Sequence, residues 1–152
     1  MIMIKKILII IFFLTLNSCG YTPIYSDSNN NKFTIESINI EGDREINNFL
    51  KSKFQRYSAP NQEKKFSFNI NTNYIKNPIS KDTTGKIIVY QLEISVIINV
   101  KSKHLNKNYN YRESFLLKND NDKFEEKSYE NSIKQNLTNT IFEKFILNFM
   151  NK

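Results

Sequence analysis

Two residue types with distinctive chemistry occur once each in this chain, a cysteine and a histidine. Cys19 stands where an apolar N-terminal run ends, in the stretch LTLNSCGYTPIY, and His104 stands in the segment KSKHLNKN. A lone cysteine cannot form an intramolecular disulfide, and one cysteine with one histidine cannot furnish a His/Cys metal site. No glycine-flanked serine and no glycine-rich loop is present. We therefore predict no catalytic residues, no cofactor and no metal, so the chain is not expected to be an enzyme.

The N-terminal segment has the organisation of an export signal. Two lysines, Lys5 and Lys6, precede the apolar run ILIIIFFLTL over residues 7–16. That run is shorter than the ~20 residues that a membrane-spanning helix needs, and it has the length of a signal-peptide core. The lysines hold the amino end on the cytoplasmic side while the apolar part enters the membrane. We predict a signal peptide over residues 1–18 and an exported mature chain.

The end of this signal predicts the chemistry of Cys19. Leu16, Ser18 and Cys19 resemble the bacterial lipobox, in which the cysteine sulfur takes a diacylglyceryl group through a thioether. Cleavage before Cys19 then frees an amine that can take a third acyl chain. Two or more chains anchor a protein stably, at roughly 0.8 kcal/mol per buried CH₂. The alternative is a chance cysteine beside an ordinary signal peptide or an uncleaved anchor. By the same resemblance, Gly20 permits sorting to the outer membrane.

Composition limits the class of partner. The formal net charge of +7 favours an anionic partner, such as a membrane surface or a phosphorylated glycolipid. No run of five or six like charges occurs, although a dedicated nucleic-acid binder usually shows a denser cluster. Export also argues against a nucleic-acid partner. Many of the asparagines and lysines fit an AT-rich genome, so single surface residues of these types carry little information.

Periodicity predicts six elements after a tether over residues 19–32. Asp43 is expected to cap a helix that ends near Tyr57, and Asp122 with Glu125 resembles a capping box that opens a second helix. A change of parity near Glu36–Ser37 predicts a bulge in the first strand. Residues 77–86 are turn-rich and read as a connection. The predicted strands span 33–40, 66–74, 88–100 and 108–118, and the predicted helices span 44–57 and about 122–150.

The long second helix carries an apolar stripe with spacings of four residues. We expect its last three turns to be the most deeply packed part of the helix. Glu125, Glu126 and Glu130 are assigned to the solvent-facing side of this helix. The stripe consists of Tyr129, Ile133, Leu137, Ile141, Phe145 and Phe149.

These elements predict an α+β fold. About four mostly antiparallel or mixed strands would form a sheet covered by two helices, in the order β-α-β-β-β-α, as a two-layer sandwich over residues 33–152. The strands alternate apolar and polar residues, so one face of the sheet is expected to be wet.

The start of the mature chain resembles a known family. CGYTPIY (residues 19–25) matches the C-G-[FY]-x-P-[LI]-Y beginning of the lipopolysaccharide-assembly outer-membrane lipoproteins, the small E subunit of the Lpt lipopolysaccharide-transport complex. The element order and the late strand TTGKIIVYQLEISVIINV (residues 83–100), followed by an aromatic strand, agree with that family.

The resemblance implies a function and a cellular location. It implies a non-catalytic lipoprotein, anchored in the outer membrane through acylated Cys19, with its body in the periplasm or inside a barrel lumen. There it would plug and assemble a large β-barrel translocon and contact lipopolysaccharide through basic residues. Candidate contacts for the lipid A phosphates are Lys101, Lys103, Lys107 and Arg112.

Other interpretations stay open. The four basic residues could be no more than a solvated turn in a lysine-rich protein. The same anchor and fold class would also serve another envelope-assembly lipoprotein, such as a barrel-insertion accessory or a secretion-pore pilotin. An exported hydrolase is the weakest alternative, because only His104 could act as its histidine base and no recognisable nucleophile accompanies it.

Overall fold

The computed structural model describes residues 33–150 of the chain. The predicted signal peptide, Cys19 and the tether lie outside the described residues. Within them the order is β-α-β-β-β-α, as predicted, which gives an α+β fold. The elements are β1 (Thr34–Gly42), α2 (Arg44–Tyr57), β2 (Lys65–Lys81), β3 (Ile87–Lys101), β4 (Asn106–Lys118) and α3 (Lys123–Met150).

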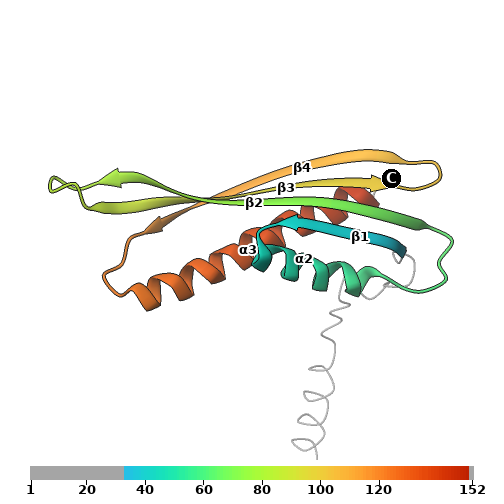
Figure 1. Ribbon diagram of the computed structural model, residues 1–152, viewed down its shortest axis with the longest axis horizontal. Coiled ribbons are helices and arrows are strands. Elements are labelled where there is room, and N and C mark those ends of the chain that lie inside the picture. The colour runs from blue at the N-terminus through green and yellow to red at the C-terminus, as the bar shows by residue number, and fades with distance from the viewer. Residues whose placement is uncertain (1–32, 151–152) are drawn as a thin grey trace, which may run out of the picture. The chain divides into compact units, whose positions relative to one another are not determined.

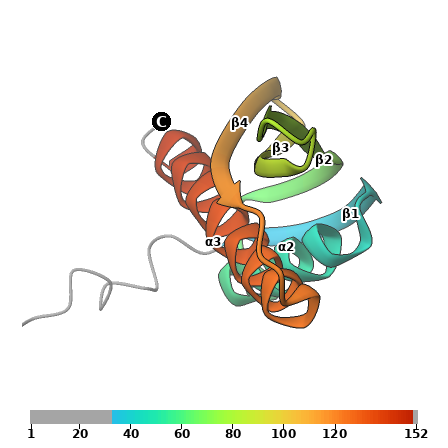
Figure 2. The ribbon, with the colours of Figure 1, turned by 90° about the vertical axis from the view of Figure 1, so that its left-hand side faces the viewer.

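The four strands form one mixed sheet in the order β1-β2-β3-β4. β1 pairs with β2 in parallel, and the other two pairs are antiparallel. Because parallel neighbours need a crossover, α2 connects β1 to β2 across one face of the sheet. Both helices cover that inner face, and the outer face is not covered by any helix of the described part (Figures 1 and 2). The predicted bulge is confirmed by a register shift between Ile35 and Ser37.

The start of α2 is fixed by a cap and a glycine. As predicted, Asp43 is the N-cap, and its Oδ1 accepts the backbone N–H groups of Glu45 and Ile46, both at 3.0 Å. Gly42 has a φ of 110°, and a Cβ there would lie 1.8 Å from the carbonyl oxygen of Thr72. Only glycine allows this conformation and this close approach. The pair therefore turns the chain directly from β1 into α2.

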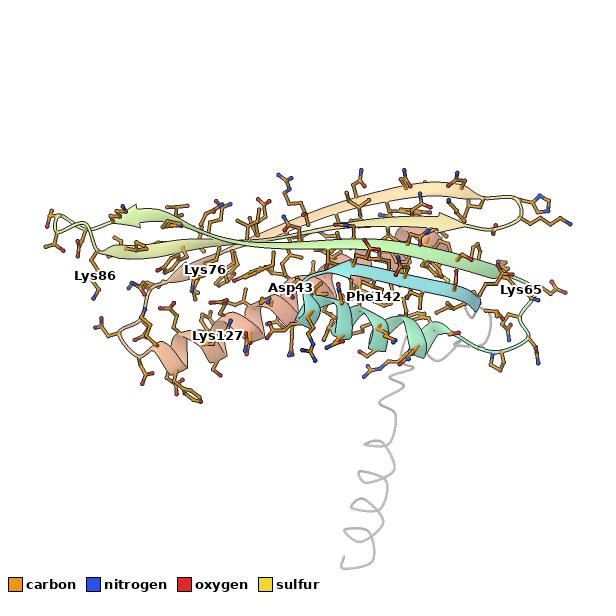
Figure 3. All side chains as sticks on the ribbon, viewed as in Figure 1. Asp43, Lys65, Lys76, Lys86, Lys127 and Phe142 are labelled. Carbon is orange, nitrogen blue, oxygen red and sulfur yellow. The ribbon has the colours of Figure 1, made fainter. Side chains whose placement is uncertain are left out.

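The core is built mainly from phenylalanines between the sheet and the helices. Phe54 of α2 and Phe142 of α3 meet edge to face with ring centroids 5.1 Å apart, and Phe145 stacks on Phe149 at 5.3 Å. Within α3, the apolar packing is thus deepest in the C-terminal half, as predicted, and Phe142 lies between that helix and the rest of the core (Figure 3). The fully buried rings are Phe33, Phe54, Phe68, Phe142 and Phe145.

β2 is longer than the sequence pattern indicated. The segment expected to begin a connection at Asn77 continues as strand to Lys81, and Pro78 pairs with Tyr90 of β3. Proline is tolerated in an edge strand because its missing N–H is not needed there. β1 pairs with β2 only as far as Thr72, so β2 is an edge from that point on. The result is a long β2–β3 hairpin that closes at Gly85, whose φ is 84°.

The buried side of α3 also differs from the prediction at its N-terminal end. Tyr129 is 53% exposed, whereas Glu126 and Glu130 are only 7% and 5% exposed. A helix has 3.6 residues per turn, so a stripe with spacings of four drifts by about 40° at each step. When the stripe is followed back to Tyr129, it has rotated away from the side of α3 that faces the sheet. The assignment of Glu126 and Glu130 to the solvent face was therefore wrong, while Glu125 is exposed as predicted.

Candidate functional site

Three of the four predicted lipopolysaccharide contacts lie at the hairpin between β3 and β4. The turn is closed by a hydrogen bond from the Ser102 N–H to the Leu105 carbonyl oxygen at 2.8 Å. Lys101 and Lys103 are exposed, and Lys107 is half-buried. His104 is exposed in the same turn, and its backbone N–H donates to the Ser102 hydroxyl oxygen at 3.4 Å. The fold thus places three ammonium groups on one short hairpin.

The three lysines do not all point to the same side of the sheet. Lys101 continues the outer-face alternation of β3, whereas Lys107 pairs with Val100 and shares the inner face of β4 with buried Tyr109. The Nζ atom of Lys107 lies 4.7 Å from the Tyr109 ring centroid, a cation–π distance. Lys101 and Lys107 therefore extend from opposite faces of the sheet.

Arg112 lies apart from these lysines. It pairs with Ser95 in the middle of β4, five residues and so about 17 Å along the strand from Lys107. Its side chain is 71% exposed, and its Nε lies 3.4 Å from the Oε1 atom of Glu93. The structure therefore gathers Lys101, Lys103 and Lys107, but it does not bring Arg112 to them.

A second charged group, absent from the sequence-based predictions, lies between β2 and α3, where its two glutamates are buried and its lysine and tyrosine are half-buried. The Nζ atom of Lys76 lies 2.9 Å from Glu126 Oε1 and 2.8 Å from Glu130 Oε2. The Tyr74 hydroxyl donates to Glu130 Oε1 at 2.9 Å. Lys76 extends from β2 on the side that faces α3 (Figure 3). We call Tyr74, Lys76, Glu126 and Glu130 the buried charge cluster.

Every carboxylate oxygen of the buried charge cluster has a partner. Glu126 Oε2 accepts from Lys123 at 2.8 Å and from the Asp120 backbone N–H at 3.0 Å. Glu130 Oε1 also accepts from Lys127 at 3.2 Å. The hydrogen bonds from Lys123 and Lys76 lower the pKa of Glu126 to about 2. Burial alone would raise the pKa of Glu130, but the hydrogen bonds from Lys76, Tyr74 and Lys127 outweigh burial and lower it. Both acids are therefore carboxylates at neutral pH.

The cationic and phenolic members are held in one protonation state as well. Burial alone would lower the pKa of Lys76, but its hydrogen bonds to Glu130 and Glu126 outweigh burial and raise it. Burial and the bond to Glu130 raise the pKa of Tyr74. Along β2 every second side chain faces the helices, and Tyr74 and Lys76 both fall at such positions. This alternation is the sequence signal from which the position of Lys76 beneath α3 could have been predicted.

Lys134 extends this ionic contact to the start of α2. It is 6% exposed, and its Nζ lies 3.1 Å from Asp43 Oδ2 and 2.6 Å from Glu45 Oε2. The same Nζ is 4.3 Å from the Tyr74 ring centroid. Burial would lower the pKa of Lys134, but the bonds to Glu45 and Asp43 outweigh it and raise it. Asp43 therefore caps α2 and joins it to α3 with one carboxylate.

The ion pairs of the buried charge cluster connect α3 to β2. Each charge of the cluster is paired with another, so none of its side chains is available to a substrate as a nucleophile or a base.

In residues 33–150, no three His, Cys, Asp or Glu side chains come together in a way that could hold a metal ion. None of the helices in that range has both the length and the hydropathy of a membrane span.

Three solved bacterial proteins share this fold. Uncharacterized lipoprotein B from Nitrosomonas europaea matches with a TM-score of 0.54 at 12% identity, over 76% of this chain and 83% of its own. Rare lipoprotein B from Shewanella oneidensis matches at 0.51 and 10%, over 76% and 97%. A minor lipoprotein from Acinetobacter baumannii matches at 0.50 and 13%, over 75% and 94%. The chain thus has the fold of small bacterial lipoproteins. No family model and no curated protein matches its sequence.

Proposed function

We propose that this protein is a non-catalytic outer-membrane lipoprotein that plugs and assembles a β-barrel lipopolysaccharide translocon and helps deliver lipopolysaccharide to the outer leaflet. The observation that carries the proposal is the combination of a lipobox-like cysteine with a body that has the fold of small bacterial lipoproteins. In this proposal Cys19 carries the acyl chains, and the body stands in the periplasm or inside the barrel lumen.

The surface of the body supports a plug. The lumen of a wide outer-membrane barrel is polar, so a domain inside it needs a polar exterior and a rigid interior. The uncovered outer face of the sheet has a polar residue at most positions of β2 and β3, among them Asn69, Asn71, Ser95 and Asn99. The interior is held rigid by the phenylalanine core and by the buried charge cluster. Both requirements are met by residues that the structure describes.

The hairpin lysines support contact with lipopolysaccharide. Lys101 and Lys103 are exposed, and no carboxylate in the described part forms an ion pair with either of them. Phosphate groups bind such ammonium groups through charge-assisted hydrogen bonds. Arg112 is a weaker candidate for this contact because Glu93 already lies beside it.

The anchor is tested on the protein from cells. Intact-mass analysis of the wild-type chain is expected to show cleavage before Cys19 and the added mass of its acyl chains. Cys19→Ala is expected to leave the signal peptide attached and to remove the acyl mass. A free thiol on the wild-type chain would end the proposal, because the location depends on that modification.

The partner is tested by affinity purification and cross-linking. A tagged wild-type chain is expected to recover a large β-barrel protein from detergent-solubilised membranes, and its depletion is expected to stall lipopolysaccharide inside the cell. A photo-crosslinker at Lys103 is expected to trap lipopolysaccharide. Recovery of a barrel-insertion machine or a secretion pore instead would assign the protein to another envelope-assembly role.

A further inference from the structure

The outer face of the sheet carries an unbroken row of asparagines. The strand register pairs Asn39 with Asn69, Asn69 with Asn99, and Asn99 with Asn108, so one asparagine comes from each of the four strands. All four lie on the face opposite the phenylalanine core. Neighbouring strands are about 4.8 Å apart, so the amides repeat at that spacing across the sheet. We call these four residues the asparagine row.

A second row beside it completes a shallow hollow. Asn71 pairs with Ile97, and Ile97 pairs with Asn110, on the same outer face. Two isoleucines line the hollow, and only Ile97, at 51%, is exposed, because Ile70 is 3% exposed and belongs to the core. The outer-face side chains that line the hollow are Asn39, Glu41, Asn69, Asn71, Ile97 and Asn99.

Much of the hydrogen-bonding capacity of this face is unused. The side chains of Asn69 and Asn71 make no hydrogen bond to any residue in the described part of the chain. Asn99 donates through Nδ2 to Asn108 Oδ1 at 2.6 Å, but its own Oδ1 is buried and accepts nothing there. A buried acceptor without a donor is unfavourable, so the described part of the protein leaves this oxygen with an unmet demand for a donor.

The chemistry of the hollow selects the class of ligand. Its one charged residue is Glu41, whose carboxylate accepts from the Asn39 amide at 3.0 Å. This negative charge disfavours an anionic ligand, and a single exposed carboxylate binds a cation only weakly. The hollow has one exposed large apolar side chain and no aromatic ring, unlike the core of a protein–protein interface. Each asparagine offers two donors and an acceptor, and a sugar hydroxyl offers one donor and two lone pairs. A series of amides at regular spacing therefore complements a series of hydroxyls.

We propose that the outer face of the sheet binds an uncharged saccharide chain along the asparagine row, with Ile97 against the apolar side of a sugar ring. The inference rests on the proposed function only for its setting, where such chains occur as the saccharide part of lipopolysaccharide and as peptidoglycan glycan strands. It adds a contact that is separate from the phosphate contact at the hairpin lysines.

The test measures saccharide binding by the full mature chain. The protein is kept in dodecyl-dimethylamine oxide micelles, because this detergent has no sugar headgroup. The two probes are fluorescently end-labelled, one a dephosphorylated, delipidated polysaccharide released from lipopolysaccharide and the other a glycan strand cut from peptidoglycan. Fluorescence anisotropy of each probe gives its Kd and shows which source the protein prefers. Saturable binding of either is expected, with a Kd that changes less than twofold between low and high salt because no charge pair forms.

Matched variants locate the site. The double variant N69A/N99A is expected to weaken binding about tenfold, since each substitution removes hydrogen bonds from the row. N69D/N99D keeps the side-chain shape but removes the amide donors, and a similar loss is expected. N136A, at an exposed asparagine of α3, is expected to stay within twofold of wild type. Far-UV circular dichroism checks that each variant is folded.

Several outcomes would overturn the inference. The first is that neither probe binds at about 1 mM protein. The second is that N69A/N99A binds as tightly as wild type. The third is that binding disappears at high salt and in the variant Lys101→Gln/Lys103→Gln. Cross-linking of the row to a protein instead of a glycan would make the face a protein interface. Because neither probe contains phosphate or a barrel, loss of this inference leaves the purification test of the proposed function unaffected, and the reverse also holds.

Discussion

The space between the sheet and α3 is filled in two different ways along one helix. The C-terminal half of α3 packs Phe142 and Phe145 into an aromatic core, whereas its N-terminal half turns Glu126 and Glu130 toward Lys76. Burial of apolar surface is non-directional, so the aromatic half supplies stability without demanding one register. Buried ion pairs are favourable only in good geometry. The comparison suggests that the aromatic half stabilises the fold and the charged half sets where α3 lies on β2.

The aromatic half should be the more sensitive to truncation. Phe145→Ala removes a fully buried ring that contacts Phe54, Phe68 and Phe149, and we expect a loss of about 3–5 kcal/mol in the free energy of unfolding. Urea unfolding of the mature chain in a mild detergent, followed by circular dichroism, measures it. Leu147→Ala, at a 60% exposed position of the same helix, is the control and should change stability by less than about 0.5 kcal/mol.

Removal of the central cation should be the next largest effect. Lys76→Ala leaves two buried carboxylates with fewer partners, and we expect a loss of about 2–3 kcal/mol because hydrogen bonds to charged groups are involved. The same urea titration measures it. Lys51→Ala, at an exposed lysine of α2, is the control. Equal losses for both variants would show that the cluster contributes no more than surface charge does.

Acid should weaken the charged half first. The pKa of Glu126 is about 2 in the folded protein against 4.5 for an unperturbed glutamate, so the folded state favours the carboxylate. Its stabilising contribution is complete above pH 4.5 and is lost as the pH falls from 4.5 through 2. Unfolding titrations across that window should show the decline. Glu126→Gln should start less stable at neutral pH and decline less, and parallel curves for the two proteins would contradict the assignment.

The exposed lysines should contribute least to stability. Lys101→Gln/Lys103→Gln should alter the free energy of unfolding by less than about 0.5 kcal/mol, since both side chains are exposed. If they contact phosphate, the same variant should bind lipopolysaccharide about tenfold more weakly at low salt. Arg112→Gln is the informative comparison, because Arg112 lies away from the hairpin beside Glu93, and its effect on binding should be smaller.

The apolar pattern of the sequence was sufficient for the elements and their order. The alternation along β3, the Asp43 cap and the parity change in β1 each reflect local rules, and the structure confirms all three. The class of fold followed from these elements because a sheet with one solvent-exposed face needs helices to cover its other, apolar face. The deep packing of the last turns of α3 was likewise visible as a widened apolar stripe.

What the sequence did not reveal depends on partners far away in the chain. Glu126 and Glu130 look like ordinary solvent-facing acids until β2 places Lys76 opposite them, 50 and 54 residues away. The length of β2 was missed because Pro78 usually marks a turn, and only the early end of β1 makes it acceptable. The asparagine row, in turn, requires the register of all three strand pairs.

The parallel pairing of β1 has a consequence for the order of assembly. Thr34 is the neighbour of Lys65 in the sheet, so this edge strand is completed only after α2 and its flanking turns have been spanned. The three following strands meet through short hairpins and can join sooner, since short loops lose less entropy on closure. We therefore expect the first strand to be synthesised to be the last to dock. Until β1 docks, the edge of β2 is unpaired and exposed, so the newly made chain is most vulnerable to self-association at that stage.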